Sequence, residues 1–318
     1  MEFEDLPRTP TADELVDQAF SRAARAGRAK SGVDAQESML LTASNVLHDN
    51  LENVVHTWPD VDALHPFYRE LADALVGVDP LREHLSEISW AAGKTRELGR
   101  DHIGRLPADP ESARSVRQQG FARMASVVEE VADDLDAVGE ARDTLVDLPD
   151  IRPDEPAIVV AGLPNVGKSS FVNRVTRASN EVASYPFTTE GVHVGHVERN
   201  HVTYQIVDTP GMLDRPERER NDVEAQAASA LTHLADVVVV ILDASGQCGY
   251  PLDDQRSLLA DVEARFDVPV IAVCNKADLS RDVEADHYMS VSEGENVEAV
   301  LDAAIDAVGY EPDLPFDQ

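Results

Sequence analysis

Cysteine and long apolar runs are scarce in this chain. Only two of its 318 residues are cysteine, Cys248 and Cys274, which is too few for a disulfide framework and typical of a reducing compartment. There is no stretch of about 18 apolar residues and no apolar run near the first residue, so the sequence predicts neither a membrane-spanning helix nor a signal peptide. We therefore expect a cytoplasmic protein with no membrane partner.

Lysine is also rare, and acidic residues outnumber basic ones. Lys and Arg total 27, of which four are lysine, against 60 Asp and Glu, so the formal net charge is −33. The excess is even along the chain, −15 over residues 1–150 and −18 over 151–318. Even acidity of this kind resembles the proteins of halophiles, in which a hydrated carboxylate surface is screened by salt. Because the Debye length is about 3 Å in molar salt, net charge then neither indicates nor excludes a nucleic-acid partner.

Residues 1–150 show no strand pattern. Apolar residues at helical spacing predict helices over 12–28, 35–56, 65–76, 80–104 and 110–147, which we interpret as an antiparallel helical bundle. Thr11 has the features of an N-cap. The aromatic side chains of this region are expected in the core: Trp58, Phe67, Tyr68, Trp90 and Phe121. A proline-punctuated stretch over 151–156 predicts a linker, which divides the chain into domains at 1–150 and 157–318.

The densest cluster of cations lies on the first predicted helix. It comprises Arg22, Arg25, Arg28 and Lys30. From spacing alone a solvated helical face is favoured over a contact with nucleic acid.

Residues 157–318 alternate between strands and helices. Short apolar runs predict buried strands over 157–161, 237–242 and 269–274, and a last strand over 287–290. Two further strands, 191–198 and 202–207, are joined by a short connection that predicts an antiparallel hairpin. Helices are predicted over 219–234, 252–265 and 295–308. The fold class is therefore an α/β domain with a mostly parallel sheet and one antiparallel edge, preceded by the all-α bundle.

A glycine-rich loop follows the first of these strands. Residues 162–169 read G-L-P-N-V-G-K-S and fit G-x-x-x-x-G-K-[ST], the phosphate-binding loop between a strand and a helix. Lys168 is expected to neutralise phosphate charge and Ser169 to bind Mg²⁺. The loop and helix start predict contacts to the nucleotide from Gly162, Pro164, Asn165, Val166, Gly167, Lys168, Ser169 and Ser170.

Two more motifs stand at strand ends, where such sheets bind ligands. Residues 208–211 read D-T-P-G, in which Asp208 would hold Mg²⁺ through a water and the Gly211 amide would reach the γ-phosphate. Residues 275–278 read N-K-A-D, in which the carboxylate of Asp278 would accept the two donors of the guanine edge. The expected contacts here are Asp208, Thr209, Pro210, Gly211, Asn275, Lys276 and Asp278. Together these motifs predict a GTP site.

Two loops complete the predicted site. Residues 185–189 read Y-P-F-T-T, and Thr189, with Thr188 as the adjacent alternative, would complete the Mg²⁺ shell and sense the γ-phosphate. Phe187 is assigned to the same loop. Ser290, Val291 and Ser292 stand where a second guanine-contacting loop is expected, although Val291 and Ser292 depart from its usual S-A-K form. The residues predicted to act in catalysis are Lys168, Thr189 and Gly211.

The variants of these motifs resemble one family. G-L-P-N-V-G-K-S, Y-P-F-T-T and D-T-P-G are similar to Obg-related GTPases of the translation-factor-like class. The run 208–221, D-T-P-G-M-L-D-R-P-E-R-E-R-N, and H-P-F-Y at 65–68 resemble the nucleolar GTP-binding protein 1 (Nog) family in its archaeal form. This resemblance implies a GTPase of large-ribosomal-subunit assembly, with Mg²⁺ as cofactor and rRNA or a subunit precursor, but not DNA, as partner. Under it, phosphate contact by Arg22, Arg25, Arg28 and Lys30 becomes as plausible as a solvated face.

The residue after the D-T-P-G motif predicts slow turnover. Met212 occupies the place where Ras-like enzymes carry a water-orienting glutamine, and a thioether cannot position water as an amide does. Asn165 resembles the asparagine that binds K⁺ in related GTPases, although an asparagine that merely stabilises the loop fits equally well. The alternative function is an Obg-like nucleotide-sensing switch that is not stably bound to pre-ribosomes.

Overall fold

The computed structural model describes residues 3–146, 148, 151–176, 180–183, 192–208, 213, 225 and 228–310. Within them the chain forms two compact units. One comprises 2–63 and 76–146, and the other comprises 64–75 together with 147–318. The division at 1–150, 151–156 and 157–318 stays a prediction, but residues 64–75 group with the later part of the chain.

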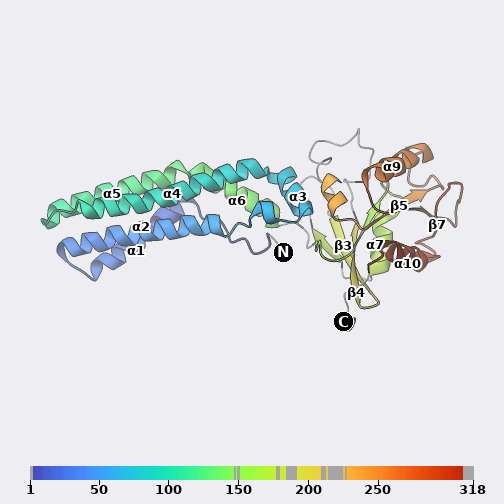
Figure 1. Cartoon of the computed structure of the whole chain (residues 1–318), viewed down its shortest axis with the longest axis horizontal. Coiled ribbons are helices and arrows are strands. Elements are labelled where there is room, and N and C mark those ends of the chain that lie inside the picture. Colours follow the sequence, from blue (N-terminus) through green and yellow to red (C-terminus); the bar gives the residue numbers. More distant parts are fainter. Residues whose placement is uncertain are drawn as a thin grey trace. The chain divides into compact units, whose positions relative to one another are not determined.

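The first unit is helical, as predicted (Figure 1). It contains α1 (Ala12–Arg28), α2 (Gly32–His56), α4 (Val78–Gly104), α5 (Pro110–Glu130) and α6 (Ala132–Val146). Thr11 caps α1 as predicted, because its hydroxyl accepts from Glu14 N at 3.3 Å while the Glu14 carboxylate accepts from Thr11 N at 3.0 Å. α2 packs against α1, α4 and α5, so it forms the centre of the bundle.

Small residues let the helices of this unit approach closely. Ala19, Ala23, Ala43 and Ala91 are fully buried. A Cβ placed on Gly99 of α4 would lie 2.3 Å from Ser44 Cβ of α2. Glycine and alanine at these positions therefore set the spacing between the helices.

Two predictions for this unit were wrong. The helix predicted over 110–147 is two helices, because Val131 leaves the helical region (φ −105°, ψ 20°) and its buried side chain packs in the core. Trp90 is 45% exposed, whereas the other four aromatic side chains predicted in the core are buried. Trp90 was placed in the core because it is aromatic, but helical spacing puts it on a different face of α4 from the buried residues Ile88, Ala91 and Ala92.

A short helix, α3 (Pro66–Val76), belongs largely to the second unit and follows a 3-10 turn η1 (Val61–Ala63). Its residues Phe67, Tyr68 and Leu71 are buried. The Tyr68 hydroxyl donates to the carbonyl of Ile151, and Glu70 pairs with His233 Nε2 at 2.9 Å. These contacts attach α3 to residues far along the chain.

The second unit is built on a seven-stranded sheet in the order β2-β3-β4-β1-β5-β6-β7. The strands are β1 (Ala157–Ala161), β2 (Asn180–Ala183), β3 (Val192–Arg199), β4 (Val202–Asp208), β5 (Val237–Asp243), β6 (Val270–Asn275) and β7 (His287–Tyr288). β1, β4, β5, β6 and β7 are mutually parallel, and β2 and β3 form the antiparallel edge. The predicted fold class is confirmed. β2 was not predicted, and β7 is shorter than expected.

Helices cover the two faces of this sheet (Figure 1). α7 (Lys168–Thr176) and α10 (Val297–Val308) pack on one another and on the sheet, and α9 (Leu252–Arg265) packs on β5 and β6. Most of the helix predicted over 219–234 lies outside the described residues, and its end is a 3-10 turn, η3 (Leu231–His233). β1 and β5 are buried along their whole length, so the core lies around these central strands.

Candidate functional site

The carboxyl ends of the parallel strands gather the predicted motifs at one edge of the sheet. β1 leads into the glycine loop, β4 ends at Asp208, β5 at Asp243 and β6 at Asn275. In the register of the sheet Val160 is paired with Asp208, and Asp243 with Asn275. Strand order reverses direction about β1, which is where open α/β sheets bind ligands.

The glycine loop has the backbone that its residue types allow. Gly162, Asn165 and Gly167 have φ of 144°, 63° and 109°, which glycine and asparagine tolerate. A Cβ on Gly167 would lie 2.3 Å from Asn275 Nδ2, so this position also needs glycine for space. α7 begins at Lys168, which aims the free amides of the helix start at the loop.

Lys168 and Ser169 lie at the start of α7. The Lys168 side chain is buried, and its Nζ donates to the carbonyls of Gly162 at 2.8 Å and Leu163 at 3.2 Å. The Ser169 hydroxyl donates to Asp208 Oδ2 at 2.5 Å. The two predicted magnesium ligands from separate motifs are thus brought together.

The N-K-A-D loop at 275–278, which we call the guanine-reading loop after its predicted role, is tied to the glycine loop by two side chains. Asn275 Nδ2 donates to Val166 O at 2.8 Å, and its Oδ1 accepts from Val291 N at 3.1 Å. Lys276 Nζ donates to Asn165 O at 3.1 Å. Asp278 is exposed. The structure therefore joins three predicted segments, 162–169, 275–278 and 290–292, through direct hydrogen bonds.

The serine loop is closed on itself. Ser290 is buried, and its backbone exchanges hydrogen bonds with Glu295, N to O at 3.0 Å and O to N at 2.9 Å. The hydroxyls of Ser290 and Ser292 lie 3.1 Å apart. This compact turn follows β7 and lies beside Asn275; its contact with guanine stays a prediction.

The remaining predicted residues lie outside the part that the structure describes. They are Phe187, Thr188, Thr189, Thr209, Pro210 and Gly211, with Met212. The predicted RNA-contacting cluster is described: Arg22, Arg25, Arg28 and Lys30 are exposed on α1 and the turn after it. Among the described residues, no carboxylate forms an ion pair with any of these four cations.

Sequence reasoning missed two residues beside this site. They are Asp243, the last residue of β5, and Gln255 of α9, whose side chain hydrogen-bonds the backbone of Asp243. Asp243 is fully buried, and its Oδ2 accepts from Lys276 Nζ at 2.6 Å. Burial disfavours ionisation, but hydrogen bonds from Lys276 and Ser245 outweigh it, so the pKa of Asp243 is lowered. An acidic residue directly after an apolar central strand was the signal in the sequence.

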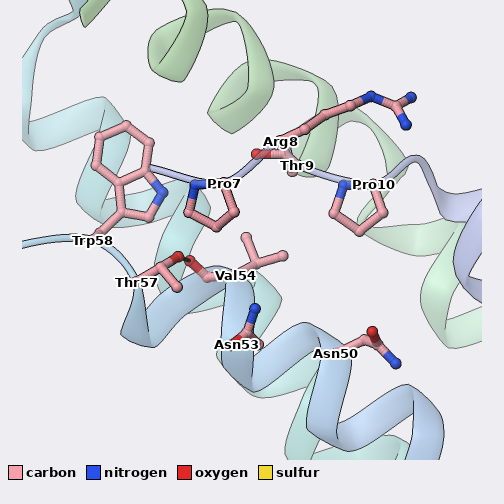
Figure 2. A pocket seen from close by; sticks show the side chains of 9 residues that line it. All are labelled: Pro7, Arg8, Thr9, Pro10, Asn50, Asn53, Val54, Thr57 and Trp58. Carbon is pink, nitrogen blue, oxygen red and sulfur yellow. Dashed lines mark hydrogen bonds between the residues drawn. The ribbon is translucent and has the colours of Figure 1, made fainter. Parts of the chain in front are cut away.

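A cavity in the helical unit contains none of the predicted site residues. It has a volume of about 230 Å³ and lies where the extended segment 7–10 crosses the end of α2 (Figure 2). It is lined by Pro7, Arg8, Thr9, Pro10, Asn50, Asn53, Val54, Thr57 and Trp58. In the described residues, no helix is long and apolar enough to cross a membrane, and no group of three or more His, Cys, Asp or Glu side chains is placed to hold a metal.

Comparison with known proteins identifies both parts of the chain. The family model of the NOG1 N-terminal helical domain matches residues 3–152, and that of the 50S ribosome-binding GTPase matches residues 157–276. An uncharacterized protein of Methanocaldococcus jannaschii is 35% identical over 288 residues, covering 87% of this chain and 81% of that protein. The chain belongs to the nucleolar GTP-binding protein 1 family. It is thus a GTP-binding protein with a GTPase domain.

Eukaryotic relatives of this family are longer. Nucleolar GTP-binding protein 1 of Drosophila melanogaster is 36% identical over 73% of this chain, but the match covers only 36% of the fly protein. A crystal structure described as nucleolar GTP-binding protein 1 from Plasmodium falciparum is 33% identical, with a TM-score of 0.47, and covers 51% of this chain and 90% of that one. The chain spans between a third and a half of the curated eukaryotic relatives it matches.

Proposed function

We propose that this protein hydrolyses GTP while assisting assembly of the large ribosomal subunit. The observation that carries the proposal is the convergence of the glycine loop, Asp208 and the N-K-A-D loop at the switch point of the sheet. These three segments carry the residue types that recognise a phosphate, a metal ion and a guanine base. Family membership supports the connection to the ribosome.

Ser169 and Asp208 fit a magnesium ion. A hydroxyl and a carboxylate oxygen 2.5 Å apart are the hard oxygen donors that Mg²⁺ takes alongside phosphate oxygens and water. Bound Mg²⁺ would neutralise charge on the β- and γ-phosphate oxygens. Lys168 would add its ammonium to the same oxygens, and the amides at the start of α7 would donate hydrogen bonds to the phosphates.

The roles assigned to the other loops complete this proposal. Thr189, or the adjacent Thr188, would close the metal shell, and the Gly211 amide would bond the γ-phosphate. Phe187, Thr209 and Pro210 would line the same site. Asp278 would accept from the guanine edge, and Val291 would present its backbone to the base oxygen. Because Met212 cannot orient water, the intrinsic rate is expected to be slow.

The positive charge at one end of the helical unit favours a polyanionic partner. Contacts of Gly27 with Met39, Gly120 with Leu40 and Arg117 with Gln36 place the segments 20–40 and 96–123 together. These segments carry ten basic and six acidic residues, whereas the rest of 1–150 carries five and 24. Charge of opposite sign to the rest of the chain, concentrated at one end, is the footprint of a surface that contacts phosphates. Arg22, Arg25, Arg28 and Lys30 lie in it.

Sedimentation of the full chain tests the proposal. We expect co-migration with large-subunit precursors when the GTP state is maintained, and its loss for Lys168→Ala. Migration only as free protein in every nucleotide state would instead favour the nucleotide-sensing switch.

A charge variant tests the basic end separately. The double variant Arg22→Gln with Arg25→Gln should weaken rRNA binding and lower the salt slope of log K by about 0.7–0.9 for each phosphate that is no longer neutralised. The matched control removes two exposed arginines elsewhere, Arg69→Gln with Arg82→Gln. An equal weakening in both pairs would show that overall charge, not this surface, governs binding.

A further inference from the structure

Asp243 ends the central strand β5 with a carboxylate shielded from solvent. Its exposed fraction is 0%. Oδ1 accepts from the Ser245 amide at 2.8 Å and the Ser245 hydroxyl at 2.5 Å, and Oδ2 accepts from the Cys248 amide at 2.8 Å. A buried carboxylate with this many donors is held in one orientation.

The backbone of Asp243 is fixed as well. Gln255 of α9 accepts from Asp243 N with its Oε1 at 2.7 Å and donates to Asp243 O with its Nε2 at 3.0 Å. Gln255 is itself 1% exposed. Strand, turn and helix thus all act on the position of one carboxylate.

The fixed carboxylate faces the lysine of the guanine-reading loop. Lys276 has a left-handed backbone (φ 55°), unusual for a residue with a long side chain. Its Nζ lies 2.6 Å from Asp243 Oδ2 and 3.1 Å from the carbonyl of Asn165 in the glycine loop. The ammonium therefore bridges a buried anion and the phosphate-binding backbone.

We propose that Asp243 is a positioning residue for guanine-nucleotide binding, which holds Lys276 against the glycine loop and so fixes the base-reading loop relative to the phosphate-binding loop. This inference rests on the proposed GTP site. Asp243 does not touch the nucleotide in this role. It acts through Lys276. By keeping the base-reading loop and the phosphate-binding loop in register, it lowers the rate at which a bound nucleotide dissociates.

The isosteric variant Asp243→Asn tests the role. An amide at this position is uncharged and has one acceptor oxygen in place of two, so its NH₂ must face either the Ser245 amide or the Lys276 ammonium and the Cys248 amide, which are all donors. We expect dissociation of a fluorescent GDP analogue from the full-length protein to quicken roughly ten- to a hundredfold, as loss of a charge-assisted hydrogen bond implies. Preference for GTP over XTP, which depends on Asp278, should stay unchanged.

Asp236→Asn is the matched control. Asp236 precedes the same strand at its opposite end and accepts from Ala157 N at 2.8 Å, so it has a similar local bond without a path to the nucleotide. Its dissociation rate should equal that of the parent chain. Thermal unfolding without nucleotide separates stability from binding: a lowered Tm with an unchanged dissociation rate for Asp243→Asn would overturn the proposal.

A double-mutant cycle shows whether Asp243 acts through Lys276. Lys276→Gln and the combination with Asp243→Asn should release nucleotide at similar rates, whereas rates that multiply would show independent effects and overturn the proposal. If Asp243→Asn does not fold, Ser245→Ala removes one donor from the carboxylate and should quicken release about two- to fivefold. No change with Ser245→Ala would count against it. Failure of the parent chain to bind guanine nucleotide at all would instead refute the proposed function.

Discussion

At the scale of single residues, positive φ angles identify where this site depends on residue type. Asn165 and Asn200 both have left-handed backbones, with φ of 63° and 51°. Asn165 lies in the glycine loop, whereas Asn200 lies in the turn between β3 and β4. Asparagine tolerates this conformation and also carries an amide oxygen that can bind a cation. The backbone conformation alone does not show whether Asn165 is there for its left-handed φ or for its amide oxygen. Substitution can separate these two roles.

Asn165→Gly tests whether the amide oxygen binds K⁺. Glycine keeps the left-handed backbone without strain. We expect the parent chain to hydrolyse GTP faster in KCl than in NaCl at equal ionic strength, and Asn165→Gly to lose this difference. Asn200→Gly is the control and should keep it. Equal rates in the two salts for the parent chain would refute K⁺ binding.

At the scale of elements, helix packing depends on which glycines lack space. Gly99 and Gly93 both lie within α4, but a Cβ on Gly99 would lie 2.3 Å from Ser44 Cβ, whereas one on Gly93 would meet nothing within 4 Å. The same substitution should therefore have opposite effects six residues apart.

Gly99→Ala should destabilise the protein by about 1–3 kcal/mol through overpacking. Gly93→Ala should stabilise it by roughly 0.5–1 kcal/mol, because alanine favours the helix. Chemical denaturation measures both. Similar effects of both variants would contradict the close approach of α2 and α4.

α3 offers a second prediction at this scale. Tyr68→Phe would remove the donor to the buried carbonyl of Ile151, and an unsatisfied buried acceptor costs about 1–3 kcal/mol. Tyr288→Phe is the control, since its hydroxyl donates to Val283 O at 2.9 Å in a half-buried setting. It should cost less, and equal destabilisation of the two variants, measured by denaturation, would argue against a buried role for Tyr68.

How far the sequence predicted these elements depended on whether the signal was local. Apolar spacing and the cap at Thr11 located α1 and α9 closely, and motif order identified the glycine loop, Asp208 and Asn275. The break at Val131 carried no proline or glycine to mark it. The grouping of α3 with residues 147–318 and the bond from Asp243 to Lys276 join distant positions, and periodicity carries no information about such pairs.

At the scale of the whole molecule, the net charge of −33 predicts that stability depends on salt. Carboxylates repel one another across the surface, and screening shortens the range from about 30 Å at 0.01 M to about 3 Å at 1 M. We expect Tm to rise as KCl or NaCl increases over this range. A Tm independent of ionic strength would contradict self-repulsion, and an uncharged osmolyte of equal osmolality is the control.

The attachment of α3 also has a consequence for synthesis of the chain. Tyr68 and Ile151 are separated by 83 residues, so α3 is made well before the residues that cover it. Its apolar side chains Phe67 and Leu71 then stay accessible while the remaining helices of the bundle emerge. The compact unit that contains α3 therefore cannot be completed until the residues after 147 have been synthesised.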